Sequence, residues 1–202
     1  MKSREDLAKL LPCARPMSWF RKGRHIHVAD RMQTRYRYTL QEDPGENLDF
    51  SPALTPAQML ALGVFEGKYL NDCVLELPRE WFANALVKLS PGGPDPSLNE
   101  FEIKSRQPLR YWRQKGWVPV FPDDPDVRGW FQWYCRYWLG RRLPIIDTIQ
   151  IKRWNAFRRH EGQILASYRR LGDQAPKTNA EKRNHRARQR QALLQWAYNP
   201  YV

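Results

Sequence analysis

The segment 128–142 constrains the fold more than any other part of the chain, because six of the nine residues from 130 to 138 are aromatic. Most of these rings recur with the spacing of one helical face: Trp130, Trp133, Tyr134, Tyr137 and Trp138. Much of the opposite side is formed by Arg128, Gln132, Cys135 and Arg136. Gly140 followed by two arginines is typical of a helix C-terminus. Since so many rings need partners that cover them, we expect the rest of the chain to pack around this helix.

The helix signals along the chain predict a mainly α fold, a single compact helical domain with a few short strands in the N-terminal half. Short helices are expected where a capping residue or proline precedes apolar residues, at 3–11, 55–63, 78–85 and 108–115. Strands are expected where apolar and polar residues alternate, at 25–28 and 35–38, with another short one at 101–103.

Two longer helices are expected near the C-terminus. Asp147 is predicted to cap a helix that reaches Leu171, and Gly162 weakens that helix midway. Thr178 and Glu181 match a capping box, which predicts a last helix running to about residue 198. We expect residues 1–52 to form an N-terminal segment of mixed charge that packs on a Trp/Arg-rich helical core, 53–202.

The positive charge is distributed unevenly along the chain. The formal net charge is +13, yet residues 1–102 carry 13 Lys/Arg against 14 Asp/Glu, whereas residues 103–202 carry 21 against 7. This asymmetry favours contact with nucleic acid, RNA or DNA, or with another anionic partner. An acidic protein partner is an alternative to nucleic acid. The simplest alternative is that the basic composition serves only the solubility of the protein.

Three cysteines lie far apart in the sequence, at Cys13, Cys73 and Cys135, without a Cys-x-x-Cys pair. This pattern predicts neither a disulfide framework nor a zinc site, and it favours a reducing compartment. No apolar run approaches the ~18 residues of a membrane span, and the first residues lack a signal-peptide core. We therefore expect a cytoplasmic or nuclear protein without a membrane partner.

Arginines and tryptophans alternate in the C-terminal half, and together they form the strongest functional signal. Phosphate groups need cations, and unpaired bases need flat rings or guanidinium planes on which to stack. The predicted nucleic-acid-binding residues are Arg106, Arg110, Trp112, Arg113, Trp130, Trp133, Arg136, Arg141, Arg142, Lys152, Arg153, Arg158 and Arg159. The aromatic rings also have a simpler interpretation, as ordinary core residues.

A second candidate site is the polar segment 66–73 together with Glu76. Gly67 permits a tight bend, and Lys68, Asp72 and Glu76 are groups that transfer protons. Asp72 and Glu76 would share one side if this segment were helical. Structural ion pairs are the alternative role for all three. His160 is a further candidate base, paired with a carboxylate.

Neither a metal nor another cofactor is predicted. His25 and His27 lack a third ligand nearby, and the single Gly-Lys pair lacks the spacing of a phosphate-binding loop. No cysteine or serine has a recognisable nucleophile setting.

Three stretches carry a resemblance to a known group of sequences. They are Phe-Glu-Gly-Lys-Tyr-Leu-Asn-Asp-Cys at 65–73, Gly-Trp-Phe-Gln-Trp-Tyr-Cys-Arg-Tyr at 129–137, and Arg-Gln-Arg-Gln-Ala-Leu-Leu-Gln-Trp-Ala-Tyr at 188–198. Over residues 54–198 the chain resembles an uncharacterised family of small Trp/Arg-rich basic proteins. That family has Gly in place of Glu66, and it often has cysteines before the last helix that are missing here. The resemblance implies one compact domain and indicates nothing about function.

Two functions follow from these observations. The first is nucleic-acid binding through a basic-aromatic C-terminal face, with a nucleic-acid-processing activity if Asp72 and Glu76 act as acids. The second is an enzyme that acts on a small anionic or aromatic substrate in a pocket lined by Arg and Trp. The first predicts cations spread over an open face, and the second predicts arginines that converge with Asp72 or Glu76.

Overall fold

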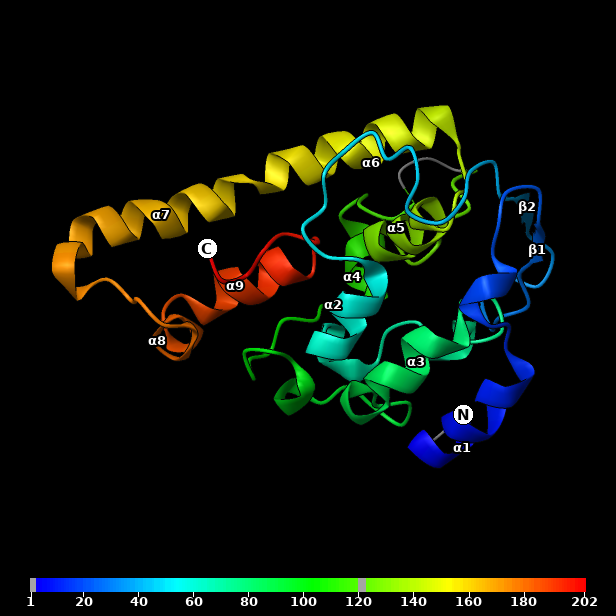
Figure 1. Cartoon of the computed structure of the whole chain (residues 1–202), viewed down its shortest axis with the longest axis horizontal. Helices are drawn as coiled ribbons and strands as arrows, with labels where there is room; N and C mark the ends of the chain where they lie inside the picture. Colours follow the sequence, from blue (N-terminus) through cyan, green and yellow to red (C-terminus); the bar gives the residue numbers. More distant parts are fainter. Residues whose placement is uncertain (1–2, 120–122) are drawn as a thin grey trace.

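The aromatic segment forms helix α5 (Trp130–Trp138), as predicted, in a computed structural model that describes residues 3–119 and 123–202. Figure 1 shows α5 between the long helices at one edge of the molecule and the short helices on the other side. All residues of α5 except Trp138 are buried, including Gln132 and Arg136. The helix therefore has no polar outer face, and its polar side chains need partners in the interior.

The other elements are mostly short. In chain order they are α1 (Arg4–Leu10), β1 (His25–His27), β2 (Arg37–Thr39), α2 (Pro56–Leu62), α3 (Arg79–Ala85), α4 (Leu109–Gln114), α6 (Pro144–Phe157), α7 (Arg159–Leu171), α8 (Asn179–Asn184) and α9 (Ala187–Leu194), with single 3-10 turns between several of them. The two strands pair antiparallel, with His25 opposite Thr39. The fold is thus mainly helical, with short strands in the N-terminal half.

Local capping signals are confirmed at three helices. Complete capping boxes form between Ser3 and Asp6 at α1, between Thr55 and Gln58 at α2, and between Thr178 and Glu181 at α8. In each box, the side chain at the cap accepts a hydrogen bond from the third helical N–H, and the side chain there bonds back to the cap. Pro56 occupies the first position of α2, where a missing N–H costs nothing.

The expected helix from Asp147 to Leu171 is two helices, α6 and α7, and both its start and its bend differ from the prediction. The chain becomes helical at Pro144, and Asp147 instead accepts hydrogen bonds from Trp133 Nε1 (2.8 Å) and from the backbone N–H of Leu143 (2.6 Å). The break lies at Arg158, whose N–H bonds to Asn155. Gly162 lies inside α7 and breaks nothing. In Figure 1, α6 and α7 follow one another along one edge.

The predicted last helix is also divided, and the predicted strand at 101–103 is wrong. The extended backbone of His185 ends α8, and Arg186, with a φ of +55°, starts α9 in a new direction. Glu102 has a φ of +52°, which a strand cannot accommodate. The neighbouring Phe101 instead donates its N–H to the side chain of Gln191 on α9 (3.1 Å).

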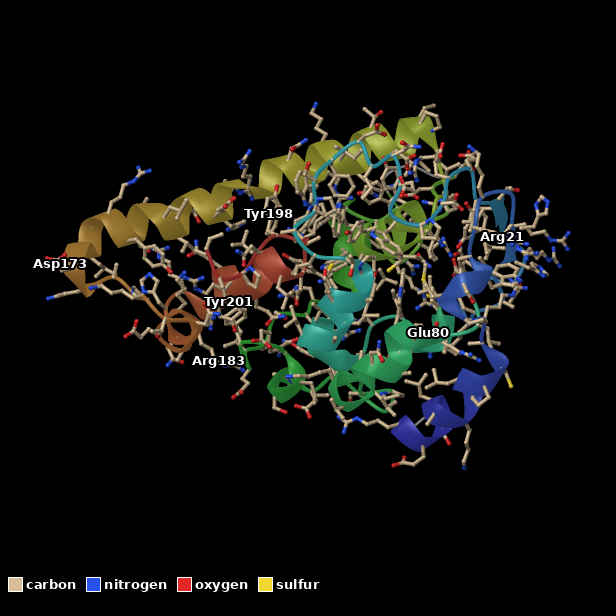
Figure 2. The ribbon with its side chains drawn as sticks, in the orientation of Figure 1. Arg21, Glu80, Asp173, Arg183, Tyr198 and Tyr201 are labelled. Carbon is tan, nitrogen blue, oxygen red and sulfur yellow. The ribbon has the colours of Figure 1, made fainter. Side chains whose placement is uncertain are left out.

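Most of the buried apolar residues form a single cluster that extends from Leu7 in α1 to Tyr198 after α9, and Phe101 and Val118 are buried outside it. Tyr198, labelled in Figure 2, stacks on Trp154 of α6 with ring centroids 4.6 Å apart. Phe20 and Ile26 of the N-terminal segment belong to the same cluster. Among the described residues, no helix combines the length and the apolar character that a membrane crossing requires.

Candidate functional site

The polar segment 66–73 does not form one α-helix, because two short 3-10 turns, Phe65–Gly67 and Asn71–Cys73, are separated by the left-handed residue Leu70. Phe65, Glu66 and Leu70 have φ values of +51°, +58° and +60°, a conformation that favours glycine. Gly67 has a φ of +67°, and a Cβ there would lie 2.6 Å from the carbonyl oxygen of Lys88. The loop therefore lies directly against the backbone that follows α3.

The Glu66 carboxylate is not available as a catalytic group, because its hydrogen bonds attach this loop to residues 105 and 106. Its buried carboxylate accepts hydrogen bonds from the N–H groups of Ser105 (3.0 Å) and Arg106 (3.1 Å). Its own N–H donates to Asn99 Oδ1 (2.8 Å). These bonds fix the position of Arg106 beside Lys68.

A cavity of about 230 Å³ opens at this loop, and we call it the cationic pocket. Its charged lining consists of four cations and one carboxylate: Arg31, Lys68, Arg106, Arg128 and Asp72. These residues come from four separate segments of the chain. The excess of cations makes the pocket complementary to an anion.

Arg128 is held rigidly at the base of the cationic pocket. One terminal nitrogen of its guanidinium lies 2.7 Å from Asp72 Oδ2 and 3.1 Å from Asp30 Oδ1. Burial alone raises the pKa of the Asp30 carboxyl, but hydrogen bonds from Met32 and Gln33, with the charge of Arg128, outweigh burial and lower it. Asp30 therefore stays charged and keeps Arg128 in place.

Lys68 is a titratable group of the pocket whose pKa is lowered by its surroundings. Burial, followed by the charges of Arg31 and Arg106, lowers the pKa of its ammonium group. Its Nζ donates a hydrogen bond to the carbonyl oxygen of Pro91. A lysine made less basic by neighbouring cations releases its proton more readily than an ordinary lysine, and while it is charged it can bind an anion.

A second cavity, of about 470 Å³, adjoins the first, and we call it the aromatic pocket. The two cavities share four lining residues: Phe65, Tyr69, Gln107 and Trp112. The aromatic pocket is further lined by Trp117, Trp130, Phe131, Phe157 and Trp196, and by the cations Arg153 and Arg159. Trp112 packs against Gly129, where a Cβ would lie 3.5 Å from its ring and 2.8 Å from Val118 Cγ2.

Glu76, Arg136 and Arg141 lie in the interior, away from both pockets, which corrects their predicted placement in a site or on a surface. Arg136 Nε lies 2.6 Å from Glu76 Oε1, and Arg136 NH1 lies 3.1 Å from Asp126 Oδ1. Arg141 forms a bidentate pair with Asp126, at 2.9 and 2.5 Å. The side chains of Glu76, Arg136 and Arg141 are at most 3% exposed, so these charges neutralise one another.

Other predicted site residues also have structural roles in the fold. Trp133 is fully buried. Arg142 donates to the carbonyl oxygen of Tyr137 at the end of α5 (2.7 Å). The His160 ring packs on Phe157, its Nδ1 has no hydrogen-bond partner among the described residues, and burial with the charge of Arg159 lowers its pKa. The carboxylate partner predicted for His160 is thus not found in the described chain.

The remaining predicted residues divide between the pockets and the surface. Asp72, Lys68 and Arg106 meet in the cationic pocket, Trp112 lies between the pockets, and Trp130, Arg153 and Arg159 line the aromatic pocket. Arg110, Arg113, Lys152 and Arg158 are exposed. Arg31 and Arg128 are pocket residues that the sequence does not predict, since no spacing relates them to Lys68.

A buried group of Asp30, Cys73 and Glu76 has ligand atoms within 4.8 Å of one another. Both carboxylates are already paired, Asp30 with Arg128 and Glu76 with Arg136. Burial raises the pKa of the Cys73 thiol, which donates to Asp30. A metal ion would have to displace two arginines and a proton, so this geometry favours a neutralised core over a metal site.

Comparisons with protein-family models, with curated proteins and with solved structures gave no match for this chain. The interpretation of the site therefore rests on its geometry. A cationic pocket beside an aromatic pocket can hold an anion and orient an attached apolar group.

Proposed function

We propose that the protein binds a small anionic ligand, of the phosphate or carboxylate class, in the cationic pocket. The observation that carries this proposal is the convergence of Lys68, Arg106, Arg31 and Arg128 with a single carboxylate, Asp72, in one concave site. A concave arrangement of this kind favours the small-ligand hypothesis over an open binding face. In this site Lys68 donates to the anion from its charged ammonium group, and Asp72 sets the electrostatic balance around it.

The cations of the pocket differ in whether they are already paired with a carboxylate or can still donate hydrogen bonds to a ligand. Arg128 is already paired with Asp30 and Asp72, so it contributes charge and rigidity more than new hydrogen bonds. Arg31 is exposed and Arg106 is partly exposed, and no ion pair with a described residue engages either guanidinium. Together with Lys68, these two side chains are the direct ligands of the anion in our proposal.

Replacing Lys68 with glutamine is expected to weaken sulfate binding by roughly 10-fold or more, because a charge-assisted hydrogen bond contributes about 1.5–3 kcal/mol. Sulfate keeps its charge over the whole accessible pH range, so it reports on the protein alone. Isothermal titration calorimetry with sodium sulfate at constant ionic strength measures the change. Lys9→Gln, at an exposed position of α1, is the matched control and should bind as the unmodified protein does.

The pH dependence gives a second readout of the same site. The Lys68 ammonium binds anions only in its charged form, so sulfate affinity falls as pH rises through its pKa. Since that pKa lies below the usual 10.5, the fall begins at a lower pH than for an ordinary lysine. The Lys68→Gln variant should lack this step. Equal sulfate affinity in Lys68→Gln and Lys9→Gln would contradict the proposal.

Nucleic-acid binding is a second candidate, favoured by exposed cations beside the aromatic pocket. Arg110 and Arg113 are exposed on α4, the helix that carries Trp112. Arg158 and Arg159 are exposed at the junction of α6 and α7, and Arg159 lines the same pocket. We propose these four arginines as phosphate contacts for a strand that crosses the pocket mouth.

For this second candidate, we expect oligonucleotide affinity to fall steeply with salt, with a log–log slope of about −0.7 per phosphate contact on single strands. Replacing both Arg110 and Arg113 with glutamine should reduce the magnitude of that slope by about 1.4. Quenching of tryptophan fluorescence by short single-stranded and duplex oligonucleotides at several salt concentrations measures the slope. An unchanged slope in the double variant, or no binding at low salt, would exclude this face.

A further inference from the structure

We infer that the aromatic pocket is the second half of the anion site and receives a planar aromatic ring attached to the anion, so that the ligand is an aromatic phosphate or carboxylate. This inference rests on the proposed function, because the cationic pocket has to hold the charged group. The supporting observation is the shared wall of Phe65, Tyr69, Gln107 and Trp112, which places the two cavities in direct contact.

The size and lining of the aromatic pocket fit a ring better than water. At about 470 Å³ it is the larger of the two cavities, and aromatic side chains predominate in its lining. Trp117 remains 47% exposed and Trp112 is partly exposed, although most other rings of the chain are buried. Two indole rings next to a cationic pocket thus keep surface that a flat ligand would cover, and such stacking is favourable.

Rings that line the pocket already pack on one another. Trp196 stacks on Phe157, with centroids 4.7 Å apart and planes at 10°, and contacts Trp130 at a tilt, at 4.8 Å and 31°. Arg153 places its guanidinium 5.8 Å from the centre of the Trp196 ring. Flat rings with a guanidinium beside them are the surroundings in which heteroaromatic groups stack, whereas an aliphatic chain gains nothing from these orientations.

The pocket also carries its own positive charge, from Arg153 and Arg159. Burial lowers the pKa of the Arg153 guanidinium, with Asp124 acting in the opposite direction, yet arginine stays charged under all ordinary conditions. A ring that carries carbonyl or ring-nitrogen acceptors therefore matches this pocket better than a bare hydrocarbon does. The ligand class is accordingly an anion joined to a planar ring that carries hydrogen-bond acceptors.

Three probes of equal charge class test this inference by calorimetry: inorganic phosphate, octyl phosphate and 1-naphthyl phosphate. We expect 1-naphthyl phosphate to bind on the order of 10- to 100-fold more tightly than inorganic phosphate, as expected for stacking of one base-sized ring. Ala156 is an exposed residue that lines the aromatic pocket. Ala156→Trp should fill the pocket and remove that gain, while leaving the affinity for inorganic phosphate unchanged. Ala166→Trp, at an exposed position of α7 outside the pocket lining, is the matched control.

Each outcome separates the inference from the proposed function. Equal affinity for all three probes, with loss of binding in Lys68→Gln, overturns the aromatic subsite and leaves the anion site intact. Tighter binding of octyl phosphate than of 1-naphthyl phosphate overturns the planar ligand in favour of an acyl chain. A gain for 1-naphthyl phosphate that survives in Ala156→Trp places the ring elsewhere and also overturns the inference. If no probe binds, the proposed function itself fails.

Discussion

Replacing Arg136 with methionine is expected to lower the free energy of unfolding by about 3–5 kcal/mol, the usual cost of removing one partner from a buried ion pair. The guanidinium of Arg136 has no exposed surface, and both carboxylates that it contacts, on Glu76 and Asp126, are buried. Methionine fills much of the volume but supplies no positive charge. The Glu76 carboxylate would retain the hydroxyl of Tyr38 as a hydrogen-bond donor, at 3.0 Å, without a cation to balance its charge.

Urea denaturation followed by tryptophan fluorescence measures this change. Arg188→Met is the matched control, since Arg188 is exposed on α9, and its effect should stay within about 0.5 kcal/mol. A loss below about 1 kcal/mol in Arg136→Met would show that the interior tolerates unpaired carboxylates or admits water. In that case, Arg136 would have to be considered again as a candidate contact residue.

Replacing Gly140 with alanine is expected to cost about 2–5 kcal/mol, from left-handed backbone strain together with a steric clash. Gly140 has a φ of +108°, and a Cβ there would lie 2.0 Å from the carbonyl oxygen of Glu42. The clash is with backbone, which cannot rotate away. The carbonyl oxygen of Gly140 also accepts the N–H groups of Gln41 (2.7 Å) and Glu42 (3.1 Å), so a shift at Gly140 disturbs the 41–45 loop.

Gly162→Ala is the matched control for this prediction, and its effect should have the opposite sign. Gly162 lies inside α7 without a positive φ, and a Cβ there would meet no described atom within 4 Å outside its own helix turn. Alanine should therefore stabilise the protein by roughly 0.5–1 kcal/mol through its better helix propensity. Thermal unfolding of both variants gives the comparison. Similar melting temperatures for the two variants would mean that the 41–45 loop, which packs against Gly140, can shift at little cost in free energy.

The elements set by neighbouring residues could be predicted from the sequence. The capping boxes at Ser3, Thr55 and Thr178, the hairpin strands and the aromatic helix depend on residues only a few positions apart. The breaks at Arg158 and Arg186 could not be predicted. Arg190 shows why: its guanidinium donates to the hydroxyl of Tyr168 on α7, and only the folded chain brings that hydroxyl beside α9.

The candidate site could be predicted only in part, for the same reason. Lys68 and Asp72 are predictable because they share a short polar segment with the bend at Gly67. Arg136 and Arg141 look equally available in the sequence, which does not reveal that Glu76 and Asp126 lie buried beside them. Charge density along the chain thus indicates where cations are, but not which of them are already neutralised.

The interior ion pairs also have a consequence for how the chain folds. Arg136 contacts Glu76, 60 residues before it, and Gln33, 103 residues before it. A guanidinium enters the core only when its partners are in place, because a lone buried charge is very costly. Since closing such long loops is slow, we expect the rings of α5 to become buried while the guanidinium of Arg136 is still hydrated. The water around that guanidinium would then leave in a late step of folding. The order of assembly would then be set by charge neutralisation rather than by the aromatic rings around it.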